Sequence, residues 1–373
     1  MHRMKTRACA VAVLVTAVVS AGCASALGIS LCEYRSPETL LIDAGLSFSY
    51  QFFDDADTAG IDVSRGEIDF SFARIRDTET FGFLARLDGH VGLAQFLPSS
   101  WLGDGETSFR YYVSSDLPLF GFGGLRGTAA SSQTQPGLEL QSGFGFGRFH
   151  DVTPLAKAMT IHRNLRDTKA IGVMLSDSVL TQIAQAIGGL TVAGNVSDVL
   201  ASIETSVETA AGVQLDARSL LMIEDIVTSM ETQRFCGFSI QAGLGYELLD
   251  PYGGPQGFLV VLSGDLAYAP DPSGQIEGHL SFSGPFDLAN ENTLTGSFSY
   301  EILISDSSSL DAAYSFQRVK PAGLAAVTTH GVTCGLLFEV STADVLLGMT
   351  FSRTTGDLGW SMGFSVSAAM DLL

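Results

Sequence analysis

Short segments in which large apolar residues alternate with small polar ones constrain this chain more than any other feature. Residues 46–52 place leucine, phenylalanine and tyrosine on one face and serine and glutamine on the other. A period of two residues is that of a β-strand, whose successive side chains point to opposite faces. The same alternation returns in residues 68–72, 238–246, 276–282, 294–302 and 358–366. The sequence therefore predicts an all-β fold.

The composition of the two faces indicates which kind of all-β fold to expect. The polar positions are mostly serine, glycine, glutamine and alanine, and only 16% of all residues are charged, against roughly 25% in soluble domains. A soluble sandwich would place lysine and glutamate on its water-facing side. Strands of about ten residues with one large apolar face suit a tilted crossing of the hydrocarbon layer. We therefore predict an antiparallel transmembrane β-barrel, with a secreted soluble β-protein as the alternative.

Turn positions predict about fourteen strands, within a range of about twelve to sixteen. They lie at residues 44–53, 66–75, 81–94, 107–116, 118–127, 138–148, 237–249, 258–268, 276–283, 294–304, 310–318, 330–340, 345–352 and 358–369. An even number of strands returns both termini to the periplasmic side. The longer connections, residues 95–106 among them, are then expected outside the cell.

The start of the chain has the features of an export signal. Residues 1–26 combine a basic beginning, a short apolar run and small residues at their end, which predicts a cleaved secretory signal. Residues 20–23 also resemble a lipoprotein cleavage site, at which Cys23 would be acylated. Residues 27–43 are expected to form an N-terminal periplasmic segment. Residues 44–150 and 233–373 are expected to form the two halves of the barrel.

Residues 151–232 lose the alternation and show helical periodicity instead. Apolar residues recur at every third or fourth position in four successive stretches, which predicts four amphipathic helices. Pro154 and Asp216 are expected to lie where two of these helices begin. On the fourteen-strand trace the insert lies in the periplasm. It is expected either to be a plug, lid or docking module at the barrel mouth, or to be a bundle whose helices only pack on each other.

Cysteine positions predict one disulfide. Cys32 precedes the first strand and Cys236 precedes the seventh, so both are expected on the periplasmic side. Because that compartment is oxidising, a Cys32–Cys236 bridge is predicted, with free thiols as the alternative. Cys334 lies among apolar residues on the expected lipid-facing side and is interpreted as a small hydrophobic residue. No cysteine and histidine group has zinc spacing, so no metal site is predicted.

The charge of the chain favours cations inside the barrel. The formal net charge is −20, which disfavours nucleic acid as a partner. Ionisable residues at inward strand positions are candidates for a pore lining: Asp69, Arg86, Asp88, Glu139, Glu247, Asp265, Glu277, His279, Glu301 and Asp311. A water-filled lumen in which carboxylates dominate favours cations. The alternative is that these acids only solvate a polar interior.

Two segments resemble parts of known barrel proteins. Residues 143–149, with the sequence GFGFGRF, and residues 151–158, DVTPLAKA, resemble a segment of uncharacterised bacterial outer-membrane barrel proteins. The whole chain is similar in organisation to the porin and outer-membrane transporter class. Residues 361–366 follow part of the C-terminal assembly signal of that class, although Leu373 replaces its terminal aromatic residue. The resemblance implies an outer-membrane location, contact with outer-membrane lipid and insertion by the barrel assembly machinery.

Three functional hypotheses follow from these patterns. The first is a passive pore for small solutes of unidentified chemistry, without a cofactor and without enzymatic activity. The second is a closed structural or docking barrel whose insert, residues 151–232, binds a periplasmic partner. The third is an enzyme acting on lipid, because His279 and Ser281 resemble the His-x-Ser pair of the outer-membrane phospholipase. That family carries the pair on its outer face, whereas His279 is predicted to point inward, and the sequence assigns no third catalytic group.

Overall fold

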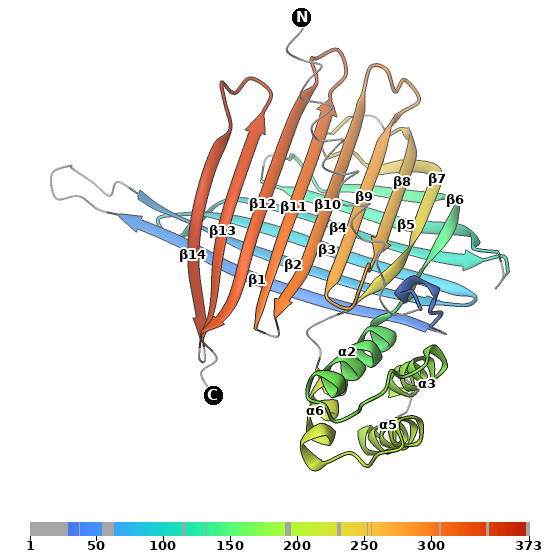
Figure 1. Cartoon of the computed structure of the whole chain (residues 1–373). Helices are drawn as coiled ribbons and strands as arrows, with labels where there is room; N and C mark the ends of the chain where they lie inside the picture. The colour runs from blue at the N-terminus through green and yellow to red at the C-terminus, as the bar shows by residue number, and fades with distance from the viewer. Residues whose placement is uncertain are drawn as a thin grey trace, which may run out of the picture.

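The protein folds into one antiparallel sheet with a group of helices inserted between its two halves (Figure 1). The computed structural model describes residues 29–370, except residues 37, 54–62, 115–116, 132, 191–194, 230–232, 252, 255, 306 and 341–342. The predicted signal, residues 1–26 with Cys23, and the terminal Leu373 lie outside the described residues.

The sheet has fourteen strands, as predicted, and each strand pairs with the next in chain order. Its first half contains β1 (Glu38–Phe53), β2 (Val63–Thr78), β3 (Phe81–Ala94), β4 (Leu97–Tyr112), β5 (Leu119–Ala130) and β6 (Gly137–Asp151). Its second half contains β7 (Phe235–Leu249), β8 (Phe258–Tyr268), β9 (Gly274–Pro285), β10 (Asn292–Ser305), β11 (Ser308–Lys320), β12 (Val327–Val340), β13 (Ala343–Thr354) and β14 (Ser361–Met370). Antiparallel pairing in chain order is the strand arrangement of an up-and-down barrel. The predicted all-β class with a helical insert is therefore confirmed.

The strand β1 begins at Glu38, earlier than the predicted residue 44. Its start lies beside the end of β6, next to the insert. The Thr39 hydroxyl donates to the carbonyl of Phe149 over 3.4 Å, and the amide of Asp151 donates to the Thr39 hydroxyl over 3.0 Å. These contacts give the first residues of β1 a structural role, and so the predicted boundary at residue 44 is wrong.

The strand β4 begins at Leu97, so the predicted external loop at residues 95–106 is also wrong. Only Gln95 and Phe96 separate β3 from β4, and both have positive φ angles, of 50° and 63°. Two successive residues with positive φ are typical of a type I′ hairpin turn, which matches the twist of the strands that it joins. Pro98, a residue unusual inside a strand, lies where the register of β3 and β4 shifts, and a bulge tolerates a residue that has no amide hydrogen.

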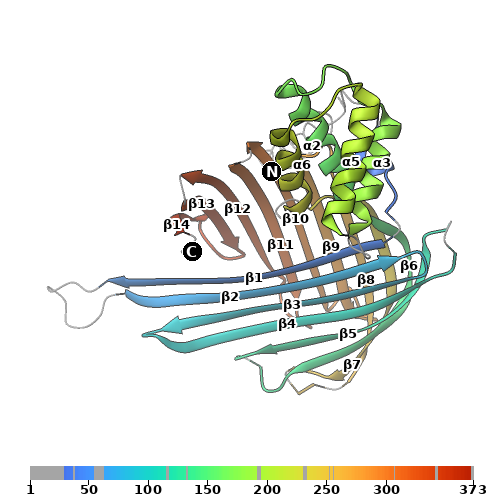
Figure 2. The same cartoon turned by 90° about the horizontal axis from the view of Figure 1, so that it is seen from below.

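The sheet is strongly curved. The strands β1–β5 run across the direction of β10–β14, and the helices lie at one end of the sheet (Figures 1 and 2). The strands β1 and β14 are the two edges, and the described residues contain no ladder between them. The curvature brings one side of β2–β4 opposite the same side of β8–β10, and we call this side of the sheet the cavity-facing side.

The opposite, outward side exposes large apolar side chains. They include Phe144, Ile240, Leu262, Leu280, Met362 and Phe364. Water-soluble monomers rarely leave a contiguous apolar surface of this kind uncovered. The outward side therefore has the composition of a lipid-contacting surface, as the alternation in the sequence predicts.

Four described helices form the insert: α2 (Thr153–Asp167), α3 (Asp177–Gly188), α5 (Val196–Ala211) and α6 (Ala217–Thr228). Asp216 caps α6 by accepting a hydrogen bond of 2.9 Å from the Ser219 amide, and Pro154 lies in the first turn of α2, where its missing amide hydrogen costs nothing. The apolar stripes of all four helices meet in one core, in which Leu155, Leu180 and Ile203 are almost fully buried. In the part of the chain that is described, no helix has the length and apolar character needed to cross a membrane.

The N-terminal segment is covalently attached to the base of the insert. Cys32, in the short helix η1 (Leu31–Glu33), forms a disulfide with Cys236 on β7, and their Cα atoms lie 5.2 Å apart. These are the two cysteines that the sequence predicts to pair. Leu31 and Tyr34 belong to the same buried core as the helices. Cys334 is a free cysteine on β12.

Candidate functional site in the sheet interior

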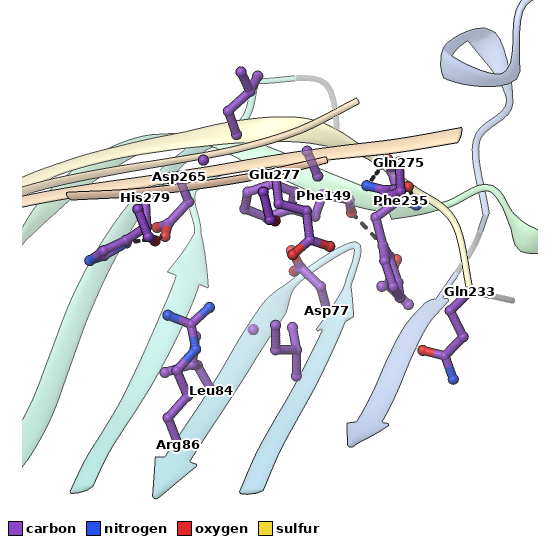
Figure 3. A pocket seen from close by; sticks show the side chains of 18 of the residues that line it. Asp77, Leu84, Arg86, Phe149, Gln233, Phe235, Asp265, Gln275, Glu277 and His279 are labelled. Atoms are coloured by element: carbon purple, nitrogen blue, oxygen red, sulfur yellow. Dashed lines mark hydrogen bonds and ion pairs between the residues drawn. The ribbon is translucent and has the colours of Figure 1, made fainter. Parts of the chain in front are cut away.

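A cavity of about 740 Å³ lies between the cavity-facing sides of β2–β4 and β8–β10. Sites for small molecules have volumes of ~300–1,000 Å³. The lining carries side chains of both charges from two facing walls (Figure 3). The first wall contributes Arg76, Asp77, Arg86, Asp88 and Arg110, and the second contributes Arg234, Asp265, Glu277, His279 and Glu301.

A second, smaller cavity of about 210 Å³ lies farther from the insert along the strands. Three carboxylates line it, from Glu139, Glu247 and Glu291, together with the guanidinium of Arg126. This second cavity therefore has an excess of negative charge.

The structure places most of the predicted pore-lining residues around these two cavities. Arg86, Asp88, Asp265, Glu277, His279 and Glu301 line the larger cavity, and Glu139 and Glu247 line the smaller one. Asp311 lies opposite Glu301 on β11 and so faces the same side of the sheet, but it is exposed and lines neither of these two cavities, and its place in a pore lining stays a prediction. The backbone of Asp69 pairs with that of His90, whereas the side chain of Asp69 is not among those that the structure describes.

A row of alternating charges crosses the first half of the sheet. The strand register places Arg86, Glu106, Arg126 and Glu139 directly opposite one another on β3, β4, β5 and β6. Residues directly opposite each other in neighbouring strands point to the same side of the sheet. Arg126 also forms an ion pair of 3.1 Å with Asp104. Glu106 and Arg126 are not distinguished by their sequence pattern, because only the strand register aligns them with Arg86 and Glu139.

Asp265 and His279 form a pair on the second wall. The Asp265 Oδ1 and His279 Nδ1 atoms lie 2.6 Å apart, and the side chains are 17% and 32% exposed. Asp265 therefore stands beside His279 where a third catalytic group would be needed, a group for which the sequence gives no candidate. The Ser281 hydroxyl, however, lies 2.6 Å from the hydroxyl of Thr295. Nucleophilic catalysis requires contact between nucleophile and base, and the described contacts of Ser281 do not include His279.

Three aromatic side chains are buried in the interior near the insert. Tyr112, Phe120 and Phe122 form a buried cluster on the cavity-facing side, although the sequence pattern predicts that large residues point outward. The Tyr112 hydroxyl donates to Asp77 Oδ2 over 2.9 Å, and the Arg110 guanidinium lies over the Phe120 ring at 5.1 Å. In β4 and β5 large aromatic residues therefore lie on both sides of the sheet.

Glycines on the neighbouring strands explain how these rings fit. A Cβ atom at Gly145 would lie 2.5 Å from Cε2 of Phe120, and one at Gly143 would lie 2.8 Å from Cε1 of Phe122. Real Cβ atoms do not approach other atoms so closely, because the repulsion is steep. Phe144, between these glycines in sequence, points outward and is 75% exposed. The glycines of the segment GFGFGRF thus leave space for the rings of Phe120 and Phe122 on the cavity-facing side, while Phe144 points to the outward side.

Arg234 connects the insert to the second half of the sheet. Its side chain is 1% exposed, and its Nη2 atom donates to Glu301 Oε1 over 3.3 Å and to the Ser273 carbonyl over 3.2 Å. Its Nε atom donates to the Pro272 carbonyl over 3.1 Å. A buried guanidinium requires such partners, because an unpaired buried charge is costly. Sequence patterns gave no sign of this role, since Arg234 lies outside the alternating strand positions.

The helices end where the larger cavity begins. Gln233, Arg234 and Phe235, which follow the insert, line that cavity, whereas none of the described residues of the four helices lines either cavity. The two chain ends of the insert lie side by side, because the Val152 amide donates to the Arg234 carbonyl over 2.8 Å. The bundle is therefore an extension of the β6–β7 hairpin and does not fill these two cavities.

The arrangement is suited to binding or passage of polar solutes. Charged groups of both signs point into a common space, and water-filled pores of membrane barrels have such linings. Among the described residues, no group of three or more histidine, cysteine, aspartate or glutamate side chains is placed to hold a metal ion.

No protein-family description matches the sequence, and no curated protein matches it. Among solved structures, the fold is similar to one described as "CymD monoaromatic hydrocarbon channel". The two chains are 9% identical, with 90% of this chain and 88% of that chain covered and a TM-score of 0.30. At this level of similarity no solute can be transferred from that protein to this chain.

Proposed function

We propose that this protein is an outer-membrane β-barrel that acts as a passive channel for small polar solutes and prefers cations. The observation that carries this proposal is the charged cavity of about 740 Å³ on one side of a sheet whose other side exposes large apolar residues. A sheet with a polar interior and an apolar exterior matches a bilayer on the outside and water on the inside.

Residence in a membrane requires that the sheet edges be covered. Each backbone amide or carbonyl left unpaired in hydrocarbon costs several kcal/mol (about 2–7 kcal/mol). The edges β1 and β14 would expose such groups along their length. We therefore propose that β1 and β14 pair in the membrane and close the barrel.

The cation preference is argued from the charges of the two linings. The larger cavity is nearly balanced, with five carboxylates against four arginines. The smaller cavity has Glu139, Glu247 and Glu291 against Arg126 alone. Negative groups that line a water-filled passage concentrate cations and repel anions. The preference therefore arises mainly at the smaller cavity.

Single-channel recording in planar bilayers tests the proposal. Folding is first checked by heat-dependent gel mobility, and the reversal potential is then measured across a KCl gradient. Discrete steps with a cation-selective reversal potential are expected. Glu139→Gln combined with Glu247→Gln should reduce the selectivity, whereas Glu224→Gln, on the exposed surface of α6, should not. A folded protein without conductance would contradict the channel, and an anion-selective pore would contradict the charge argument.

Two observations concern the other hypotheses, the enzyme that acts on lipid and the docking barrel. They are the hydrogen-bond partner of Ser281 and the position of the helices. Because Ser281 bonds to Thr295, we propose no enzymatic role for the pair. Because the bundle stands at one end of the sheet and lines neither cavity, a docking role in the periplasm is compatible with an open channel. The insert is therefore not expected to limit conductance.

A further inference from the structure

Opposite charges face each other across the larger cavity. Arg86 points from β3 toward the Asp265–His279 pair on β8 and β9 (Figure 3). Arg86 is half-buried, and it forms no hydrogen bond or ion pair with any other described residue. A partly buried guanidinium without a partner has unused donors, since five N–H groups fan out from its plane.

The facing wall offers an acceptor. Asp265 uses Oδ1 for the 2.6 Å contact with His279, and no group among the described residues donates a hydrogen bond to its other oxygen, Oδ2. Its side chain is 17% exposed, so it is sheltered from bulk water but still reaches the cavity. An ammonium group placed here would meet a carboxylate in surroundings where salt and water screen the attraction less than at the surface.

Apolar side chains lie beside these charges, toward the insert. Ile75 and Leu84 on the first wall and Phe149 and Phe235 near the second line the same cavity. They occupy cavity-facing register positions, like Arg86 and Asp265. The cavity therefore has a positive group on one wall facing a negative group on the other, and toward the insert its apolar side chains lie among polar and charged ones, such as Asp77 and Gln275.

We propose that this cavity binds zwitterionic solutes that carry an apolar group, as α-amino acids with apolar side chains do. The carboxylate would bind Arg86, for which a planar guanidinium is well suited, and the ammonium would bind Asp265. A simple cation or anion would pair with one wall only and leave the other charge without a partner. The inference rests on the proposed channel, because it names the class of solute that the lumen takes.

Block of single-channel current by three probes of similar size tests this. L-phenylalanine carries both charges, 3-phenylpropionate only the carboxylate, and phenethylamine only the ammonium. The half-blocking concentration of L-phenylalanine should be about tenfold lower than that of either other probe, since one additional charged contact contributes about that factor. Equal block by all three probes would overturn the proposal while leaving the channel intact.

Variants assign the two contacts. Arg86→Gln should weaken the block by L-phenylalanine and by 3-phenylpropionate and leave the block by phenethylamine unchanged. Asp265→Asn should weaken the block by L-phenylalanine and by phenethylamine and leave the block by 3-phenylpropionate unchanged. Arg163→Gln and Glu224→Gln, on exposed positions of α2 and α6, are matched controls that should change nothing. If Arg86→Gln affects the three probes alike, Arg86 is not the carboxylate site.

Equilibrium binding keeps the inference testable even without conductance. The same probes are titrated into the folded, detergent-solubilised full-length protein by isothermal titration calorimetry. Preferential binding of L-phenylalanine that Arg86→Gln removes would support the site even if the bilayer experiment gives no current. Absence of L-phenylalanine binding to folded protein would overturn it.

Discussion

Gly145 lies under the ring of Phe120, so even one methyl group there has no space. Gly145→Ala should therefore lower the free energy of unfolding by about 1–3 kcal/mol, the usual cost of overpacking. Urea unfolding in detergent, followed by gel mobility, measures this. Gly172→Ala, where no atom lies within 4 Å of the new Cβ, should have little effect. Adding Phe120→Leu to Gly145→Ala should restore part of the loss, and no recovery would contradict the ring contact as its cause.

His162 in α2 is a second residue whose environment gives a measurable effect. It is 2% exposed, and neither ring nitrogen has a hydrogen-bond partner among the described residues. Burial, and to a smaller extent the nearby Arg166, lower the pKa of His162 below its ordinary value of 6.5. The unfolded chain therefore binds more protons than the folded one below pH 6.5, and stability must fall as the pH falls through that value.

The prediction for His162 is that the urea midpoint of the helical signal at 222 nm is lower at pH 5.5 than at pH 7.5. His162→Phe, which keeps the ring volume and removes the titrating group, should abolish most of that difference. An equal pH dependence in wild type and variant would show that another group is responsible.

At the scale of elements, a disulfide ties the N-terminal segment to β7 at the base of the insert, and Arg234 ties the end of the insert to the second half of the sheet. Joining Cys32 to Cys236 closes a loop with a sequence separation of 204 residues, for which the chain-entropy estimate of stabilisation is about 5 kcal/mol. Cys32→Ser with Cys236→Ser should release the N-terminal segment and make it sensitive to limited proteolysis, while the sheet keeps its heat-dependent mobility. Cys334→Ser is the matched control. Unchanged proteolysis would mean that packing of Leu31 and Tyr34 suffices.

The insert can also be tested as a whole element. Because Val152 and Arg234 are hydrogen-bonded neighbours, residues 154–232 can be replaced by Asn-Gly, a sequence that favours two-residue hairpin turns. We expect a folded barrel with unchanged single-channel conductance, since no described helix residue lines either cavity. An increase in conductance, with folding verified by gel mobility, would show that the bundle obstructs the channel.

At the scale of the whole molecule, closure of the sheet decides whether a membrane can hold it. Ser47 on β1 and Ser365 on β14 both occupy cavity-facing register positions. Three variants in a Cys334→Ser background test this: each combines Ser47→Cys with one of Gly363→Cys, Ser365→Cys or Ser367→Cys. In the membrane-embedded protein, the variant whose two cysteines match the true register of β1 and β14 should form a disulfide. Failure of all three in a folded protein would mean that β1 and β14 do not meet.

The sequence by itself determined the strand class and the position of the insert, and it indicated about fourteen strands and one candidate cysteine pair. These follow from local chemistry: alternation reflects the geometry of a single strand, helical stripes reflect that of a single helix, and cysteines stand out by type. Strand boundaries such as Glu38 and Leu97 were missed, because pairing partners extend a strand beyond its clearest alternation. The inward rings of Phe120 and Phe122 were missed for a related reason, since the space for them lies on neighbouring strands, at Gly143 and Gly145.

Only the tertiary structure decided which inward residues meet. Arg86, Asp265 and His279 are far apart in the chain, and the curvature of the sheet brings them to one cavity, whereas Asp311, with the same sequence pattern, lies outside it. Arg234 follows no periodic pattern, yet its buried guanidinium connects three segments. The physical reason is that side-chain periodicity specifies a face within one element, while register and curvature specify the neighbours of that face.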